Sequence, residues 1–347
     1  MAFLKKKQQP NVVLIVIDDL NDYTGFLGGH PQVKTPNMDA LAKNGLVFTN
    51  AHSNAPICGP SRASMLTGIY PHTSQNFWFD NWTENNILKN VKTLPHFLRD
   101  HGYNAFGTGK LMHQRVKSEW TAYGVENTFG PYAFNGKKVV QHPAMSKEYS
   151  QDKNDGLFTS LANVPNVAPD DKFPGFKGWY DQKNRKQFKY INDDDRDLLS
   201  DEQSANWAVQ KIDSLETHKI EKPFFLSVGF VRPHTPLVAP QKYFDLYPLE
   251  TLKIPVIKKN DAADTFYKSS FKWTPPWAQH FQELEKSYAT IEEGLRTYIQ
   301  AYLACVSFVD AQVGTVLKTL KNSSFDKNTI VILVSDHVYS LGEKDFL

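Results

Sequence analysis

The sequence predicts an α/β protein whose central, mostly parallel sheet is covered by helices on both faces. Three apolar runs, at 11–17, 224–230 and 329–334, are short, nearly continuous and bounded by polar residues, as expected of strands buried inside a parallel sheet. Helical segments lie between them, and strands that alternate with helices are typical of βαβ units. The 347 residues suffice for one large α/β domain with insertions.

Composition excludes several classes of protein. The chain has 39 basic and 37 acidic residues and a net charge of +2, which excludes the strong positive field of a nucleic-acid-binding protein. An anionic ligand would therefore be held by a local cluster of charges. No apolar run approaches the ~20 residues that a membrane-spanning helix needs. The two cysteines, Cys58 and Cys305, are too few for a disulfide framework.

The first half of the chain alternates between strand and helix. Thr35 and Pro36 have the residue types of a helix N-cap and a first helical position, and Gly45 is a typical helix end. Thr93 likewise predicts an N-cap, and Gly102 the end of that helix. The elements expected in order are a strand at 11–17, a helix at 35–45, a strand at 47–51, a short helix from about residue 60, a helix at 93–102 and a strand at 104–107.

Two segments without clear periodicity interrupt this alternation. Residues 114–200 are rich in Lys, Asp, Asn and Gly, and we expect them to form an insertion of loops over one end of the sheet, where function usually lies. A disordered excursion is the alternative, and the many Trp, Tyr and Phe residues of the segment disfavour it. A second insertion is expected at about 250–290.

The second half contains the clearest helical signal. Apolar residues from Ile299 to Leu320 recur every three or four positions, which predicts a helix with one continuous apolar face. Cys305 lies beside that face, so we expect a packed thiol rather than a reactive one. The other elements expected here are a helix at 201–218 and the strands at 224–230 and 329–334.

Ionisable residues follow the ends of three predicted strands. Asp18 and Asp19 come directly after the first strand. His234 comes shortly after the second and Asp336 shortly after the third. Because ligands of parallel α/β sheets bind beyond the carboxyl ends of the strands, these side chains are expected to converge, and three carboxylates suit a hard divalent cation. The alternative for the Asp18–Asp19 pair, a turn or a helix cap, stays open at this point.

The segment 58–68 indicates an anion site with a nucleophile. It follows a predicted strand and opens a predicted helix, so Cys58 is placed at a helix N-terminus, where free N–H groups and the helix dipole favour an anion. Arg62 follows one turn later and can return to the same place as a fork-shaped anion clamp. A nucleophile, an anion site and nearby carboxylates for a metal together predict attack on a sulfuryl or phosphoryl group.

The same segment resembles the signature of a known family. Its pattern Cys-x-Pro-Ser-Arg-x-x-x-Leu-Thr-Gly is similar to that of the formylglycine-dependent (type I) sulfatases, and the likeness extends over nearly the whole chain. The nearest branch is the iduronate-2-sulfatase type, which shares an Asp-Asp-Leu opening, an Arg/Lys-Pro-His-x-Pro run and an Asp-His ending. Further stretches in the family's order are 11–20, 35–41, Gly109-Lys110 with His113, 233–236 and 335–337.

The resemblance implies a fold, a modification and a metal. The fold is the alkaline-phosphatase-like three-layer αβα sandwich, and residues 1–347 would form its catalytic N-terminal domain. Cys58 would be converted to Cα-formylglycine by a formylglycine-generating or sulfatase-maturating enzyme, and the hydrated diol would be the nucleophile. Calcium would be bound by Asp18, Asp19, Asp336, His337 and an oxygen of residue 58. Because calcium prefers oxygen, the alternative for His337 is contact with sulfate or with the diol.

Further roles follow from the same matching. Arg62 and Lys110 would orient the diol and neutralise the charge of sulfate. His113 is expected to take the proton when the sulfated hemiacetal collapses to the aldehyde, and His234 to assist departure of the alcohol. Lys110 and His234 would therefore also contact the substrate.

An aromatic cluster at 77–82 follows the signature helix. Trp78 and Trp82 would offer flat faces to a sugar ring. Packing within the core or under a lid is an equally open alternative for these side chains.

The expected activity is hydrolysis of a sulfate ester on a carbohydrate, either a glycosaminoglycan or an algal-type polysaccharide or oligosaccharide. Two alternatives stay open: a phosphodiesterase or phosphonate monoester hydrolase with the same nucleophile, and a non-catalytic relative that binds carbohydrate or calcium. The resemblance also implies a periplasmic or secreted protein, although the lysine-rich start and the short apolar run at 12–17 lack a cleavage site.

The sequence departs from the family pattern near its last residues. Val338 follows the Asp-His pair where most of the family has Gly, so the local turn is expected to differ, and Lys344 stands at a usual His position. A second sulfate-binding lysine is expected shortly beyond Leu347. The family's smaller C-terminal subdomain, a short antiparallel sheet with a helix, is therefore expected to be missing from these residues.

Overall fold

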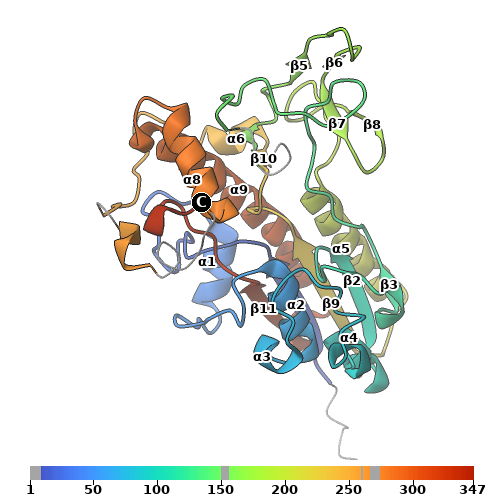
Figure 1. Ribbon diagram of the computed structural model, residues 1–347. Helices are drawn as coiled ribbons and strands as arrows, with labels where there is room; N and C mark the ends of the chain where they lie inside the picture. The colour runs from blue at the N-terminus through green and yellow to red at the C-terminus, as the bar shows by residue number, and fades with distance from the viewer. Residues whose placement is uncertain (1–8, 150–155, 259–260, 266–273) are drawn as a thin grey trace, which may run out of the picture.

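Five parallel strands form the central sheet of the computed structural model, which describes residues 9–149, 156–258, 261–265 and 274–347. The strand order is β11–β1–β9–β2–β3 (Figure 1). All four pairings in this sheet are parallel, as the sequence predicted. The bounds are Asn11–Ile17 for β1, Asn104–Gly109 for β2, Ala122–Tyr123 for β3, Phe224–Phe230 for β9 and Thr329–Ser335 for β11.

The register of the central strands makes three strand ends finish level with one another. Ile17 of β1 lies opposite Ser335 of β11 and opposite Phe230 of β9. The residues that follow continue this pairing, because the N–H of Asp18 donates to the carbonyl of Phe230 and the N–H of Asp336 to the carbonyl of Ile17, both at 3.2 Å. Side chains just beyond the three strands therefore share one edge of the sheet.

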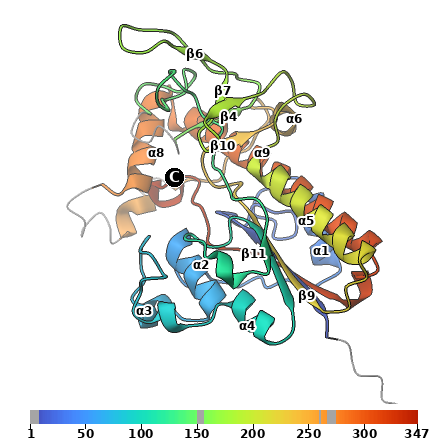
Figure 2. The same cartoon turned by 90° about the vertical axis from the view of Figure 1, so that its right-hand side faces the viewer.

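Helices cover both faces of the sheet. Figure 2 shows α1, α5 and α9 on one side and α2 and α4 on the other. Alternate residues of β1 accordingly enter two different cores: Val13 and Ile15 pack in the cluster that contains α9, and Leu14 and Val16 in the cluster that contains Leu66 of α2. This three-layer arrangement confirms the predicted fold class. The helices are α1 Pro36–Lys43, α2 Cys58–Thr67, α3 Pro71–Ser74, α4 Leu94–Asp100, α5 Ser200–Thr217, α6 Gln241–Phe244, α8 Pro276–Ser287 and α9 Ile291–Asn322.

The long helix α9 forms the centre of one layer. By length and hydropathy alone it could cross a membrane, but most of its apolar stretch is buried inside the fold. It packs against α5, α1 and α8, which explains the continuous apolar face seen in the sequence. Cys305 is completely buried on this helix, and burial raises the pKa of its thiol to about 12. The expectation of a packed, unreactive thiol is confirmed.

Short strands and two helices lie above the carboxyl edge of the sheet (Figure 1). They pack around Trp179, which is fully buried and donates from Nε1 to the carbonyl of Leu161 at 2.8 Å. The described part of 114–200 is therefore a folded layer, and the alternative of a disordered excursion is wrong there. The strand pairs are β4 Phe158–Ser160 with β10 Leu237–Ala239, β5 Asn166–Val167 with β6 Phe176–Lys177, and β7 Trp179–Asp181 with β8 Lys186–Phe188.

Three local predictions were wrong. Residues 47–51 form no strand, and Phe48 is 80% exposed, so this segment has neither a ladder partner nor a buried face within the described chain. Thr35 and Thr93 do occupy N-cap positions, but neither side chain caps its helix. The Thr35 hydroxyl instead donates to Asp39 at 2.9 Å, and that of Thr93 donates to Glu119. Each hydroxyl therefore bonds a carboxylate, within α1 for Thr35 and from a distant segment for Thr93, in place of a backbone N–H of its helix.

A buried histidine in the upper layer predicts loss of stability in acid. His142 accepts the N–H of Ala144 at Nδ1, at 3.1 Å, and its Nε2 lies 2.9 Å from the carbonyl of Asn163. This pair of contacts requires a neutral ring, and burial lowers the pKa of His142 from 6.5. The unfolded chain then binds a proton that the folded chain excludes. The contribution of His142 to the free energy of unfolding is therefore fully present above pH 6.5 and is lost as the pH falls through the lowered pKa.

We expect His142→Gln to flatten the dependence of the melting temperature on pH between 7.5 and 5. His218→Gln, at an exposed position after α5, is the matched control and should leave the slope unchanged. Differential scanning fluorimetry across this range measures both slopes, and equal slopes for His142→Gln and the parent protein would contradict the prediction.

Candidate active site

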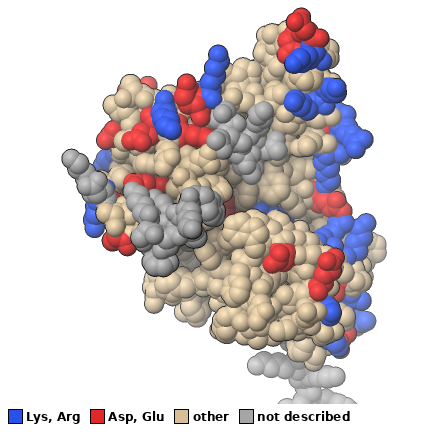
Figure 3. Space-filling view, viewed as in Figure 1, with Lys and Arg blue, Asp and Glu red and all other residues tan. Residues whose placement is uncertain are grey.

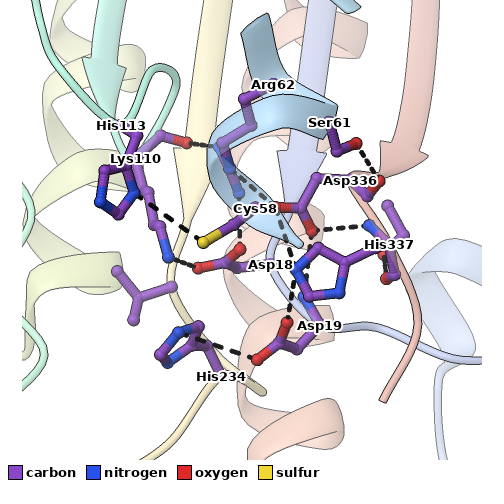
Figure 4. A network of polar contacts seen from close by, with 12 residues as sticks. Asp18, Asp19, Cys58, Ser61, Arg62, Lys110, His113, His234, Asp336 and His337 are labelled. Atoms are coloured by element: carbon purple, nitrogen blue, oxygen red, sulfur yellow. Dashed lines mark hydrogen bonds and ion pairs between the residues drawn. The ribbon is translucent and has the colours of Figure 1, made fainter. Parts of the chain in front are cut away.

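Four strand ends and one helix N-terminus meet at the carboxyl edge of the sheet (Figure 4). The structure brings together there all the residues to which the sequence assigned a catalytic or metal-binding role. They are Asp18 and Asp19 after β1, Lys110 and His113 after β2, His234 after β9, Asp336 and His337 after β11, and Cys58 and Arg62 in α2.

Three buried carboxylates and one imidazole form a group with the spacing of a metal site. Ligand atoms of Asp18, Asp19, Asp336 and His337 all lie within 4.8 Å of one another. The backbone holds the group in place, since the N–H groups of Asp19 and His337 donate to Oδ1 of Asp336 at 3.2 and 2.9 Å. Asp19 has a φ of 60°, and the hydroxyl of Tyr302 donates to its carbonyl at 2.8 Å. This left-handed residue turns the chain sharply after β1.

Two buried cations contact the carboxylates. The Arg62 guanidinium is completely buried and donates from Nε to Asp336 at 2.8 Å, from Nη2 to Asp18 at 2.9 Å and from Nη1 to the carbonyl of Lys110. Lys110 Nζ forms an ion pair with the other oxygen of Asp18. The sequence predicted that Arg62 clamps an anion at residue 58. The guanidinium contacts two carboxylates and a carbonyl in this structure, and its role as a clamp for an anion at residue 58 stays a prediction.

The charges of this group are unevenly compensated. Burial, and then the charge of Asp18, raises the pKa of Asp19 to about 7. Burial also raises the pKa of Asp336 to about 6, although Arg62 opposes it. Burial acts on Asp18 too, but Lys110 and Arg62 outweigh it and hold the pKa of Asp18 well below its usual value. Three carboxylates thus share two permanent cations and the imidazole of His337, which lies 3.1 Å from Asp19.

Cys58 is the first residue of α2 and faces the carboxylate group. It is buried, and it forms a metal-competent set with Asp18 and His337. On its other side Nδ1 of His113 lies 3.8 Å from Sγ. The chain approaches closely here, since a Cβ at the next residue, Gly59, would lie 3.1 Å from the carbonyl oxygen of Trp78. The aromatic loop therefore packs directly against the helix start.

The three histidines around Cys58 differ in charge. Burial, and then Lys110, lowers the pKa of His234 to about 3 and also lowers the pKa of His113. Burial alone would lower the pKa of His337, but its hydrogen bond with Cys58 and the carboxylate of Asp19 outweigh burial and raise it to about 10. His113 and His234 are accordingly neutral near pH 7.

Only one of the two tryptophans predicted to face the substrate is available to it. Trp78 is 49% exposed and packs edge-on against Phe79, which in turn lies against the ring of His113. Trp82 is 5% exposed, and its Nε1 donates to the carbonyl of Gln114 at 2.7 Å. The prediction of a sugar-stacking role for Trp82 is wrong, because its ring is part of a small core.

Sequence reasoning missed several residues that shape the site. The ring of Phe129 lies 4.7 Å from Nζ of Lys110 and 4.9 Å from the ring of His234. Arg232 is buried and donates to the carbonyl of Phe129 at 2.7 Å, while Asp201 accepts from the N–H of Arg232 at 2.9 Å. Arg232 is the first residue of the Arg/Lys-Pro-His-x-Pro run, so the sequence did place it near the site. Nothing in the loop around Phe129 distinguished it.

A five-stranded parallel sheet covered by helices on both faces places the chain in the alkaline-phosphatase-like class of α/β folds. Solved structures of this class share the fold. The phosphonate monoester hydrolase of Agrobacterium radiobacter matches with a TM-score of 0.63 and 20% identity, over 96% of this chain and 64% of that one. A structure described as a 2-O GAG sulfatase matches with a TM-score of 0.59 and 19% identity, over 98% of this chain and 60% of that one.

The chain belongs to the sulfatase family. The family's profile, named Sulfatase, matches residues 10–347. A sulfatase from Formosa agariphila is 36% identical over 98% of this chain and 61% of its own length. Human iduronate 2-sulfatase is 30% identical over 96% of this chain and 55% of its own length. The chain thus spans between half and two thirds of the length of these relatives.

Proposed function

We propose that the protein hydrolyses sulfate esters of a sulfated carbohydrate, with residue 58 as a Cα-formylglycine nucleophile. The observation that carries the proposal is the position of Cys58, at the start of α2 and between the buried carboxylates on one side and His113 on the other. The names of relatives support the substrate class, since these include iduronate 2-sulfatase and an ulvan-active sulfatase. A structural relative is described in complex with a disulfated glucosamine.

A calcium ion fits the carboxylate group. Buried carboxylate oxygens of Asp18, Asp19 and Asp336 lie within 4.8 Å of one another, and hard divalent cations take carboxylate oxygens as ligands. Asp18, Asp19 and Asp336 would hold the ion, with His337 beside it. When bound, calcium would supply positive charge for the sulfate oxygens and the modified residue 58.

The remaining residues would handle charge and protons. Formylglycine would supply a hydrated aldehyde with two hydroxyls. One would attack sulfur and displace the alcohol, and loss of the proton from the other would re-form the aldehyde and release sulfate. Lys110, fixed by Asp18, would place an ammonium beside the sulfate. His113, neutral and next to residue 58, is positioned to take a hydroxyl proton there. His234, on the side of Phe129, would hydrogen-bond the departing alcohol oxygen.

The resemblance supports two further parts of this proposal. A formylglycine-generating or sulfatase-maturating enzyme would modify Cys58, and the protein would act in the periplasm or outside the cell.

The test is release of inorganic sulfate by protein co-expressed with a maturating enzyme. Heparin, ulvan and carrageenan oligosaccharides and 4-nitrophenyl sulfate are the substrates, with bis(4-nitrophenyl) phosphate as the phosphodiester comparison. Peptide mass spectrometry reads the state of residue 58. Conversion of Cys58 with sulfate release supports the proposal. Faster hydrolysis of the phosphodiester than of any sulfate ester, or no sulfate release after full conversion, would overturn it.

We expect His113→Ala to separate the two halves of the reaction. Without the base beside residue 58, the first sulfuryl transfer would still occur but expulsion of sulfate would slow by about 10²–10⁴-fold, the usual size of general base catalysis. The variant should therefore show a burst without steady turnover, and intact-mass analysis after a brief incubation should show a sulfate adduct. If both steps slow together and no adduct accumulates, His113 only hydrogen-bonds the bound sulfate.

Calcium is expected to stabilise the folded protein as well as support turnover. Binding to the native state alone adds about 2.7 kcal/mol at a concentration 100 times the dissociation constant, so chelation with EGTA should lower the melting temperature and added calcium should restore it. Asp19→Asn should abolish this response, while Asp245→Asn, at an exposed position after α6, should retain it. Identical melting curves with calcium and with EGTA would contradict the prediction.

A further inference from the structure

A cavity adjoins the candidate active site and shares Phe129 with it. One side of this residue faces Lys110 and His234, as described above. Phe129 also lines a cavity of about 380 Å³, a volume within the range of about 300–1,000 Å³ that is typical of ligand pockets. The other walls are the segment 126–132, the β7–β8 hairpin and the first turn of α5.

The walls of this cavity are fixed by buried contacts. The N–H of Thr128 donates to the hydroxyl of Ser200 in α5 at 3.0 Å. The carbonyl of Phe129 is held by Arg232, and the backbones of Tyr132 and Tyr180 exchange hydrogen bonds of 3.1 and 2.9 Å. The loop is therefore fastened to α5, to the end of β9 and to β7, and the cavity exists before any ligand arrives.

The lining combines aromatic faces with uncharged polar groups. Phe188 and Tyr132 are buried beside the cavity, and Phe129, which also lines it, is partly exposed. Asn127 and Gln182 also line it, and within the described residues their side-chain amides have no hydrogen-bond partner. A sugar ring has an apolar face that packs on aromatic rings and hydroxyls that pair with amides, so this lining suits a carbohydrate.

The charges around the cavity do not repel an anionic chain. The carboxylate of Glu126 is paired with Arg115 and lies 3.8 Å from Nζ of Lys183. Asp181 accepts from the backbone and the side chain of Asn184 at 3.0 and 2.6 Å. Figure 3 shows lysine and arginine side chains along the edge of the molecule that β3 and the β7–β8 hairpin occupy in Figure 1. The hairpin itself carries exposed basic residues, Lys183, Arg185, Lys186 and Lys189.

We infer that this cavity binds a second sugar unit of the substrate, next to the unit whose sulfate lies at residue 58. The inference rests on the proposed function and narrows it to a sulfated oligosaccharide or polysaccharide, bound through at least two adjacent units. Phe129 lies between the two units and contacts both, and the basic hairpin attracts the sulfated chain beyond them.

Filling the cavity tests the inference. Gln203 lines it from an exposed position on α5, and Gln210 lies two helical turns further along the same exposed face. Gln203→Trp and Gln210→Trp are therefore matched variants, one inside the cavity and one outside it. Both are placed in Cys58→Ala protein, so that binding is measured without turnover.

Isothermal titration with sulfated tetrasaccharides from heparin, ulvan and carrageenan is the measurement. We expect at least one to bind Cys58→Ala protein, and Gln203→Trp to weaken that binding by about tenfold or more, the loss expected when a stacked sugar unit is excluded. Gln210→Trp should bind as the parent does. Equal affinities in the two Trp variants, or no binding of any tetrasaccharide, would overturn the inference.

The sulfate-release assay decides the proposed function separately. Sulfate release by mature protein without an effect of Gln203→Trp on tetrasaccharide affinity would leave the activity standing and remove the second sugar site. Conversely, tetrasaccharide binding that Gln203→Trp weakens, without sulfate release, would identify a carbohydrate-binding cavity in a protein that lacks the proposed activity.

Discussion

Cys58→Ser is expected to abolish steady turnover of sulfate esters while leaving the fold intact. A serine hydroxyl could accept sulfate, but serine has no second hydroxyl whose deprotonation could release that sulfate. We therefore expect turnover to fall by at least roughly 10⁴-fold, the order seen when a catalytic nucleophile is removed. Serine replaces a thiol of similar size at the start of α2, and the packing there should persist. Sulfate release and the thermal melting curve are the two measurements.

Cys305→Ala is the control for the loss of a cysteine. Its thiol is buried in α9, away from the strand ends that form the site, so the variant should lose stability but keep its turnover number. Substantial sulfate release by Cys58→Ser, or equal losses in both variants, would show that residue 58 is not the nucleophile.

Arg62→Leu is expected to destabilise the protein by about 3–5 kcal/mol, the cost of leaving buried charges without their partner. The guanidinium has no exposed surface and joins Asp18, Asp336 and the carbonyl of Lys110. Its removal leaves two buried carboxylates close together with only one permanent cation near them. Chemical denaturation of parent and variant measures the difference in free energy of unfolding.

Two further variants separate charge from packing in this test. Arg99→Leu, at an exposed position on α4, should change stability far less, since isolated surface substitutions usually have small effects. Combining Arg62→Leu with Asp336→Asn removes the carboxylate that Arg62 Nε contacts and keeps the pair of Asp18 with Lys110, so the double variant should lose less stability than Arg62→Leu alone. If the loss of unfolding free energy in the double variant equals the sum of the two single losses, the effect of Arg62→Leu is due to packing rather than charge.

The sheet and the convergence of its strand ends could both be predicted from the sequence, because both depend on locating the buried strands. Strands such as 224–230 are buried on both faces, so they appear as unbroken apolar runs whose ends can be counted to the residue. Once three parallel strands are located, Asp18, Asp19 and Asp336 must share an edge. Their approach within 4.8 Å of one another therefore follows from topology rather than from local conformation.

Features that depend on loops could not be predicted in this way. Trp82 and Trp78 lie in one short aromatic run, yet one is buried and the other half exposed, because the path of the loop decides which ring meets a core. Phe129 contacts Lys110 from a segment with no periodicity, held by Arg232 from a distant strand. The hydroxyls of Thr35 and Thr93 likewise bond tertiary or side-chain partners that propensity rules do not include.

The pairing of β1 with β11 also sets the order of events during synthesis. The N–H of Asp19 donates to a carboxylate 317 positions later in the chain. At a translation rate of about 5–20 residues per second, roughly 15–60 s pass between the emergence of the two residues. Through that interval the early aspartates can meet β9, but they lack the carboxylate of Asp336. The ion-binding group is completed by β11, which comes last in the sequence among the five strands of the central sheet, so any chain that stops short of β11 lacks Asp336 and has an incomplete site.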